Sequence, residues 1–316
     1  MKKIFQNLFI LTIAFVLIFT GCQKKENEID DNKKETATPL FYKISNDENT
    51  ATIYLLGSIH AADDSAYPLN ETIMSAYENS DYLAVEIDTM AITSNFDLQL
   101  ELAKKMLYID GTTIKDELGE ELYNKMVEFL ETKNSYNNLY DNYKPAFFES
   151  LFENVIINDA DMDANKGIDA HFLKLAKKDN KNILEIETAE FQYDLLLSNP
   201  IELDRLMINS YVDDYDNNVL EMKELYNAWK KGDIKELEEK LFSSDTEELS
   251  ENEIMMLEHY NQTLITDRNY GMVRALEKYM SEDKNVFCVV GLGHVIGDEG
   301  IIKLMQKNGY KIEQLG

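Results

Sequence analysis

Cysteine, proline and glycine are all scarce in this sequence of 316 residues, which contains two, four and thirteen of them respectively. If Cys22 is modified at the N-terminus, Cys288 has no disulfide partner, and its apolar neighbours predict a core residue rather than a nucleophile. No linker rich in Pro, Gly or Ser divides residues 39–316. We therefore expect one α/β domain over this range, with a large helical insertion.

Basic residues are also few in comparison with acidic ones. The chain has 31 Lys and Arg against 59 Asp and Glu, a formal net charge of −28, and loss of Lys2 and Lys3 with a signal peptide would make it −30. Such a surface repels phosphate groups, so we expect no nucleic-acid partner. Either the acidic surface only keeps the protein soluble, or it attracts cations such as metal ions or basic peptides.

The N-terminus carries one apolar run, residues 8–19, which is short for a membrane-spanning helix of about 20 residues. Lys2 and Lys3 precede this run and Thr20-Gly21-Cys22 follows it, as in a secretory signal. The Gly-Cys end resembles a bacterial lipoprotein signal. Residues 1–21 would then be removed, lipid on Cys22 would anchor the chain to the extracytoplasmic side of the cell membrane, and the polar residues 22–38 would form a flexible tether. The alternatives are an uncleaved anchor, or a plain signal with an incidental cysteine.

Apolar runs alternate with amphipathic stretches along residues 39–316. This alternation predicts a mainly parallel mixed sheet with helices on both faces. The predicted strands cover residues 52–56, 82–87, 183–187, 285–290 and 310–312. The predicted helices cover residues 68–78, 97–107, 113–129, 146–157, 167–178, 253–280 and 300–307, and one further long helix carries an apolar stripe from Ile208 to Trp229.

Two of the four histidines follow a glycine at the same spacing, just beyond a predicted strand. Gly57-x-x-His60 follows the first strand, and Gly291-x-x-His294 follows the strand that ends at Val290. The carboxyl ends of parallel strands meet at the edge of the sheet where ligands bind in open α/β folds. We therefore expect His60 and His294 to share one site. The alternative is that each ring only forms hydrogen bonds within its own turn.

Glu86 lies within an otherwise apolar strand pattern, near its C-terminal end. A buried carboxylate needs a cation or hydrogen-bond donors. With two neutral imidazoles, Glu86 would complete a set of ligands for a divalent ion such as Mn, Co, Zn or Fe, which would activate water and polarise a carbonyl group. The alternative for Glu86 is a salt bridge within the core.

Arg268 and Asn269 fall on the inward stripe of the predicted helix 253–280. An inward arginine needs an anion. Arg268 could stabilise an anionic transition state or hold a peptide carboxylate, with Asn269 donating a hydrogen bond; alternatively, Arg268 forms a buried ion pair that orients Glu86.

Five other polar residues give weaker signals. Glu187 and Gln192 could support the site or cap the end of a strand, and Asp169 is predicted to start a helix rather than to bind a ligand. His171 and His259 have charged or polar neighbours at helical spacing. We expect both of these rings to face solvent.

Several short segments, in this order and spacing, resemble the TraB/GumN group, which includes the Tiki metalloproteases and the pheromone-shutdown proteins. The matching segments run from Tyr54 to Gly300: they are Tyr54-Leu55-Leu56-Gly57-Ser58-Ile59-His60, Tyr67-Pro68-Leu69, Val85-Glu86, Lys144-Pro145, Gly167-Ile168-Asp169, Glu187-Thr188 with Gln192, residues 228–233, Asp267-Arg268-Asn269 with Met272, and residues 291–300. Val295 and Ala146 stand where the family more often has Leu and Trp.

This resemblance implies an α/β fold related to the erythromycin-esterase and Tiki groups, and metal-dependent peptide cleavage that uses His60, Glu86 and His294. We therefore predict an extracytoplasmic metal-dependent hydrolase whose substrate is a peptide or another small carbonyl compound. Two alternatives stay open. One is a lipoprotein that sequesters a peptide without cutting it, and the other is a metal-free, esterase-like hydrolase with a histidine as general base.

Overall fold

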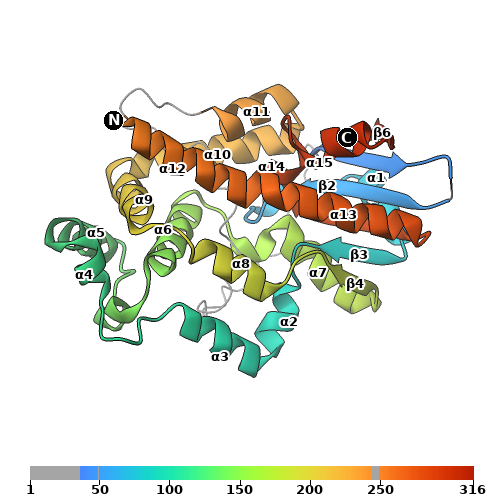
Figure 1. Ribbon diagram of the computed structural model, residues 1–316. Coiled ribbons are helices and arrows are strands. Elements are labelled where there is room, and N and C mark those ends of the chain that lie inside the picture. The colour runs from blue at the N-terminus through green and yellow to red at the C-terminus, as the bar shows by residue number, and fades with distance from the viewer. Residues whose placement is uncertain (1–35, 49, 244–248) are drawn as a thin grey trace.

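A six-stranded mixed sheet forms the framework of the protein (Figure 1). The structure is a computed structural model, and it describes residues 36–48, 50–243 and 249–316. The strand order is β4-β3-β5-β2-β1-β6, in which β2, β3, β4 and β5 are parallel and β1 is antiparallel to both of its neighbours, β2 and β6. The strands are β1 (Phe41–Ser45), β2 (Thr52–Ser58), β3 (Tyr82–Val85), β4 (Asn182–Glu185), β5 (Asn285–Gly291) and β6 (Lys311–Gln314). The predicted α/β class is confirmed.

Helices precede, separate and cover the strands. They are α1 (Glu71–Asn79), α2 (Thr89–Ser94), α3 (Phe96–Lys105), α4 (Ile114–Leu118), α5 (Glu120–Thr132), α6 (Pro145–Asp159), α7 (Ile168–Asp179), α8 (Ala189–Leu196), α9 (Ile201–Asp213), α10 (Tyr215–Lys231), α11 (Ile234–Phe242), α12 (Glu251–Asn261), α13 (Asp267–Ser281), α14 (Leu292–Val295) and α15 (Ile301–Lys307). Short 3₁₀ turns lie at Asp64–Ala66, Asn138–Asn142 and Ala164–Lys166, and a π-helical turn, η6, covers Gln262–Thr266. In Figure 1, α4, α5, α6 and α9 lie at the far end from the strands, as a helical insertion would.

Different helices cover the two faces of the sheet. Phe287 and Cys288 are neighbours on β5, so their side chains point to opposite faces. The ring of Phe287 lies 5.7 Å from that of Tyr77 on α1 and 4.6 Å from that of Phe172 on α7. Cys288 instead lies close to Tyr279 on α13, the helix that crosses the front of the strands in Figure 1. Cys288 is fully buried, as expected of a core residue.

The parallel register brings three strand ends to one edge of the sheet. Ser58 on β2 is paired with Gly291 on β5, and Val85 on β3 is paired with Val289. Glu86 therefore leaves β3 beside the last residues of β5. Gly57 and Gly291 lie inside the ends of their strands rather than in turns beyond them, but both histidines follow just past the strand ends, as predicted.

Several predicted boundaries are wrong for local reasons. The first helix begins at Glu71, because the Asn70 side chain caps it by accepting the Ile73 N–H, so Pro68 lies outside it. The helix predicted over 113–129 is two helices, broken at Gly119 with φ of +79°. The long helix predicted from Ile208 to Trp229 is also two, α9 and α10, which are separated at Asp214.

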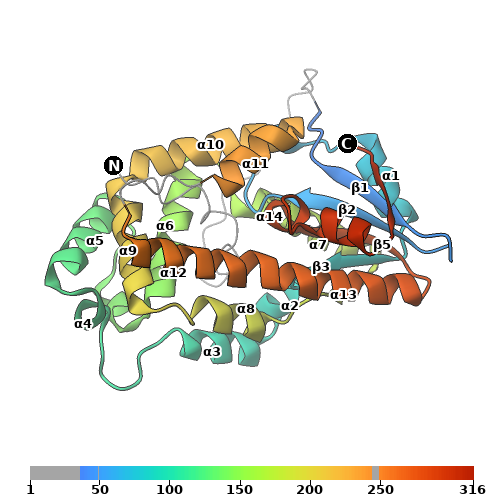
Figure 2. The same cartoon turned by 45° about the horizontal axis from the view of Figure 1, so that its top comes forward.

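Two further segments have opposite outcomes: strand β1 is absent from the predicted strands, and the predicted helix 253–280 is present. Strand β1 was missed, because five residues next to an Asn- and Asp-rich turn carry little periodicity. The predicted helix 253–280 is confirmed as α12 and α13, which run end to end through η6 (Figure 2). A π-helical turn of this kind is frequent near functional sites.

The predicted signal peptide, Cys22 and most of the predicted tether lie outside the described residues. Of the last tether residues, Ala37 is buried and the Thr38 N–H donates to the carbonyl of Lys230. In the part of the chain that the structure describes, each helix is too short or too polar to cross a membrane.

One buried hydrogen bond ties the helical part to the strand that leads to His60. The indole N–H of Trp229, which is fully buried, donates to the carbonyl of Gly57 over 2.8 Å. We expect Trp229→Phe to lower the free energy of unfolding by about 1–3 kcal/mol, because the carbonyl of Gly57 loses this donor in a dry environment. Urea denaturation measures this. Phe172→Leu is the control, since it removes aromatic volume without removing a donor, and an unchanged Trp229→Phe protein would contradict the prediction.

Candidate functional site

His60 is held from its Nδ1 side. Its ring lies 2.8 Å, Nδ1 to Oδ2, from Asp169 in the first turn of α7, and the other carboxylate oxygen of Asp169 accepts a hydrogen bond of 2.8 Å from the Ser58 hydroxyl. Gly167 makes this contact possible, because a side chain there would collide with the carbonyl oxygen of His60. The Nε2 atom of His60 is therefore the one that remains for a ligand.

His294 is held in the same way by a different partner. It lies on α14, is fully buried, and its Nδ1 is 2.7 Å from Oδ1 of Asn269 on α13. The Asn269 amide N–H₂ donates to the carbonyl of Glu299 over 2.8 Å, which fixes the amide so that Oδ1 faces the ring. Since Oδ1 can only accept, Nδ1 carries the proton and Nε2 carries a lone pair. Nε2 is buried and has no hydrogen-bond partner among the described residues.

Glu86 is surrounded by hydrogen-bond donors. Its Oε1 accepts the Gly291 N–H over 2.7 Å, and its Oε2 accepts from Arg268 over 2.5 Å and from Gln192 over 3.2 Å. Glu187 shares two of these partners, since it accepts from Arg268 at 2.7 and 2.9 Å and from Gln192 at 2.7 Å. The Arg268 side chain is 3% exposed, so this is a buried ion pair with two carboxylates.

These groups meet around Gly291. A methyl group placed on its Cα would lie 3.3 Å from Oε1 of Glu86, 3.4 Å from Nε2 of His60 and 3.7 Å from Cδ2 of His294. The structure thus brings the three predicted ligand residues to one point, with space that a larger residue at Gly291 would fill. In the residues described, however, no set of three or more His, Cys, Asp or Glu side chains is already arranged as a metal site.

The two imidazoles differ in charge in the metal-free protein. Burial lowers the pKa of His60, but the charge and hydrogen bond of Asp169, with Glu86, outweigh burial and raise it to about 9. Burial and the Arg268 guanidinium lower the pKa of His294 to about 3. Burial raises the pKa of Glu86, but Arg268 and the two histidines lower it to about 2. At pH 7 the site therefore holds one imidazolium, one neutral imidazole and one carboxylate.

Arg268 and Asn269 lie on the predicted helix 253–280, and the sequence suggests a different role for each of them. For Arg268, the structure shows the second of the two alternatives, the buried ion pair that orients Glu86. The expected hydrogen bond from Asn269 toward a substrate stays a prediction: one N–H of its amide donates to the carbonyl of Glu299, its Oδ1 faces His294, and the amide has a second N–H. Both residues act on the site by holding the groups that line it.

Asp169 and His171 make contacts that their sequence patterns do not reveal. Asp169 lies in a first helical turn, as predicted, but its carboxylate is directed at His60. The only sequence signal for this role was the glycine two positions before it. His171 was wrongly expected to face solvent: its ring is half-buried between those of Tyr67 and Phe172, at 4.8 and 5.2 Å. His259 is exposed, as predicted.

The comparison with protein families agrees with this arrangement. A model of the TraB/PrgY/gumN family matches residues 40–314, which include every residue of the site. The chain belongs to the TraB/PrgY/gumN family. A search of curated proteins and one of solved structures gave no match.

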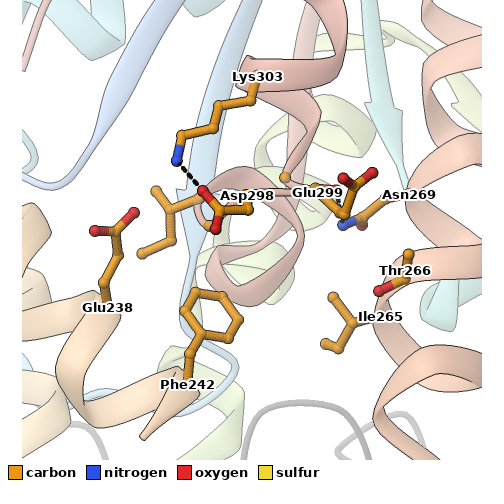
Figure 3. A pocket seen from close by; sticks show the side chains of 11 residues that line it. Glu238, Phe242, Ile265, Thr266, Asn269, Asp298, Glu299 and Lys303 are labelled. Carbon is orange, nitrogen blue, oxygen red and sulfur yellow. Dashed lines mark hydrogen bonds and ion pairs between the residues drawn. The ribbon is translucent and has the colours of Figure 1, made fainter. Parts of the chain in front are cut away.

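In this TraB/PrgY/gumN protein, a cavity of about 420 Å³ adjoins the site on the side of Asn269 (Figure 3). It lies between α11, η6 and the loop 296–300, and its apolar wall includes Phe242 and Ile265. Three carboxylates line it against one ammonium group: they belong to Glu238, Asp298, Glu299 and Lys303, and Lys303 is 2.6 Å from Asp298. The cavity is therefore suited to cations rather than anions.

The charge of His60 depends on Asp169, and this dependence gives a titration test. We expect Asp169→Asn to lower the pKa of His60 from about 9 toward 6.5 in chelator-treated protein, measured by NMR of the histidine rings. Since the folded pKa is raised, His60 contributes stability that is full below pH 6.5 and is lost as the pH rises through 9. This loss should shrink in Asp169→Asn. The control is Asp298→Asn, on an exposed carboxylate, and equal His60 titration in all three proteins would contradict the assignment.

The ion pair of Arg268 gives a stability test. Arg268→Gln leaves Glu86 and Glu187 buried without their cation, so we expect a loss of about 3–5 kcal/mol in the free energy of unfolding. Lys303→Gln breaks an exposed pair and should cost less than about 1 kcal/mol. Thermal and urea unfolding compare the two. Equal effects of both substitutions would show that the buried pair does not stabilise the site.

Proposed function

We propose that this protein is a metal-dependent hydrolase that acts outside the cytoplasm, with peptides as its first candidate substrates. The observation that carries the proposal is the buried lone pair of His294 Nε2. It has no partner among the described residues, and it belongs to a ring that lies beside Nε2 of His60 and Oε1 of Glu86. Buried polar atoms are nearly always paired in native proteins, so this atom calls for a ligand.

The residues present fit a divalent ion. His60 Nε2 and His294 Nε2 would hold it, with Glu86 as the carboxylate, and Mn, Co or Zn all accept such a donor set. Each ring gives its Nδ1–H to an oxygen, Asp169 or Asn269, which is the arrangement that orients metal-binding histidines in proteins. When bound, the ion supplies Lewis-acid polarisation of a carbonyl group and ionises water near neutral pH.

The chain's own residues prepare the site for a cation. Glu86 stays ionised because its pKa is about 2, so it offers negative charge rather than a base. Arg268 and the Gly291 N–H hold that carboxylate in place. His60 must release the proton on Nε2 when a cation binds, and Asp169 keeps the ring oriented as it does so.

One rival, a metal-free hydrolase with a histidine base, is disfavoured by the same electrostatics. With a pKa of about 9, His60 is already protonated at pH 7 and cannot accept a proton. His294 accepts one only weakly, because burial and Arg268 lower its pKa to about 3. The other rival, a protein that sequesters a peptide, uses the same groups and differs only in the lack of turnover.

The proposed location rests on the sequence. Lys2, Lys3 and the apolar run before Cys22 support export and lipid attachment, and the acidic composition, with 59 Asp and Glu against 31 Lys and Arg, agrees with a chain that has no nucleic-acid partner. Membrane contact would then be through the lipid on Cys22.

Turnover of a peptide library tests the proposal. We expect the purified full chain to cleave peptides with added Mn, Co or Zn, and to lose this activity on chelation. His60→Ala and His294→Gln should reduce it by more than the roughly 10–100-fold that loss of an outer-shell partner costs. Equilibrium dialysis should show one ion per chain in the parent protein and weaker binding in both variants.

The matched control is His259→Gln, which removes an exposed imidazole on α12 and should change neither metal binding nor cleavage. Stoichiometric peptide binding without products would favour sequestration. Full cleavage after complete metal removal would contradict the metal-dependent mechanism and favour a histidine base.

A further inference from the structure

Three carboxyl groups lie buried together in the helical part of the protein. Glu149 and Glu153 are on α6 and Asp204 is on α9, with exposed fractions of 2%, 0% and 7%. Asp204 shares a hydrogen bond with Glu149, and Glu153 accepts one of 3.2 Å from Tyr211. We call these three residues the carboxyl cluster. None of the three has an ion-pair partner within the described ranges of the chain.

Polar atoms in and around the carboxyl cluster are left without partners. Oε1 of Glu149 and Oε2 of Glu153 are buried and accept no hydrogen bond from the described residues. An independent third atom is the hydroxyl of Tyr260 on α12, which is 4% exposed, has no partner in the same residues, and interacts electrostatically with all three carboxyl groups. Each such atom is destabilising unless a ligand or water forms a hydrogen bond with it.

The carboxyl cluster lies beside the candidate site. Burial raises the pKa of Glu153 to about 8, and the charge of His60 acts on the same group in the opposite direction. On the other side, Tyr260 interacts with both the carboxyl cluster and Arg268. The carboxyl cluster therefore lies close enough to the candidate site for the charges of His60 and Arg268 to act on it and on Tyr260.

We propose that the carboxyl cluster receives a cationic group of the substrate, the ammonium or guanidinium group of a peptide. This inference rests on the proposed function and names its substrate class as basic peptides. A cation brings N–H donors to the two unpartnered carboxyl oxygens and stabilises the negative charge of the carboxylate that forms when a proton leaves, which an anionic or purely apolar group cannot do. The net charge of −28 and the acidic cavity beside Asn269 would attract the same ligands to the protein.

The carboxyl cluster holds protons until such a group arrives. Burial raises the pKa of Asp204 to about 7 and that of Glu149 well above its usual range, so burial favours the protonated form of these carboxyl groups. A bound cation would favour their ionised form, and protons would be released to solvent on binding. Glutamine matches the size of a neutral glutamic acid but cannot release a proton, which makes it a suitable test substitution.

Calorimetry on the full chain in non-ionic detergent, with metal removed by a chelator, tests this proposal. The probes are the peptides Ala-Ala-Lys-Ala-Ala and Ala-Ala-norleucine-Ala-Ala, each with a free and with an acetylated N-terminus. We expect the lysine peptide to bind about tenfold or more tightly than the norleucine peptide, with release of protons that shows as a dependence on the ionisation enthalpy of the buffer. If the α-ammonium is the group received, acetylation of the N-terminus weakens binding, whereas replacement of lysine by norleucine does not.

Glu149→Gln and Glu153→Gln should each abolish the preference and the proton release. Glu78→Gln, which removes an exposed carboxylate on α1, should keep both. Circular dichroism and thermal unfolding confirm that the variants are folded, and the double variant serves if either single variant is not. Equal binding of charged and neutral peptides, no binding of the lysine peptide, or an unchanged preference in folded Gln variants overturns the proposal.

The two proposals fail separately. The calorimetry needs neither metal nor turnover, so cation-dependent binding without cleavage would retain this inference and reject the hydrolase. Cleavage of neutral and basic peptides at equal rates would retain the hydrolase and reject this inference.

Discussion

The buried guanidinium of Arg268 connects the parts of the protein that the candidate site depends on. From α13 it reaches the carboxylates that follow β3 and β4, those of Glu86 and Glu187. Glu86 in turn accepts the N–H of Gly291 at the end of β5. One cation thus joins three strand ends to the helix that also carries Asn269, the partner of His294. Because the ion pair is desolvated, its charges are held at fixed positions.

The histidines owe their difference in charge to this arrangement and to their own partners. Asp169 is an anion, so it favours the imidazolium of His60, whereas Asn269 is neutral and leaves His294 with a free lone pair. Arg268 strengthens the contrast, since its charge is close enough to His294 to oppose protonation. Two rings that occupy similar places after similar strands are therefore not equivalent. Membership of the TraB/PrgY/gumN family covers all of these residues but does not by itself assign their chemistry.

Much of this arrangement is local and can be predicted from the sequence. Apolar runs before Gly57 and Gly291 define buried parallel strands, and the order of strands and helices fixes the edge at which His60, Glu86 and His294 appear. Contacts between distant segments are harder to predict from the sequence. The side chain of Asp169 could equally have belonged to its own helical turn, and the direction of the Asn269 amide depends on a carbonyl 30 residues away. The break at Asp214 was hidden because α9 and α10 both present apolar residues in the same phase.

The central claim is that the Nε2 atoms of His60 and His294 face one cation beside Glu86. Anomalous diffraction from crystals soaked in Mn, Co or Zn, measured at the absorption edge of each metal, tests it most directly. The account predicts one strong anomalous peak within coordination distance, about 2.0–2.2 Å, of both Nε2 atoms. Peaks confined to the acidic surface, or histidine rings whose Nε2 atoms point to separate spaces, would contradict it.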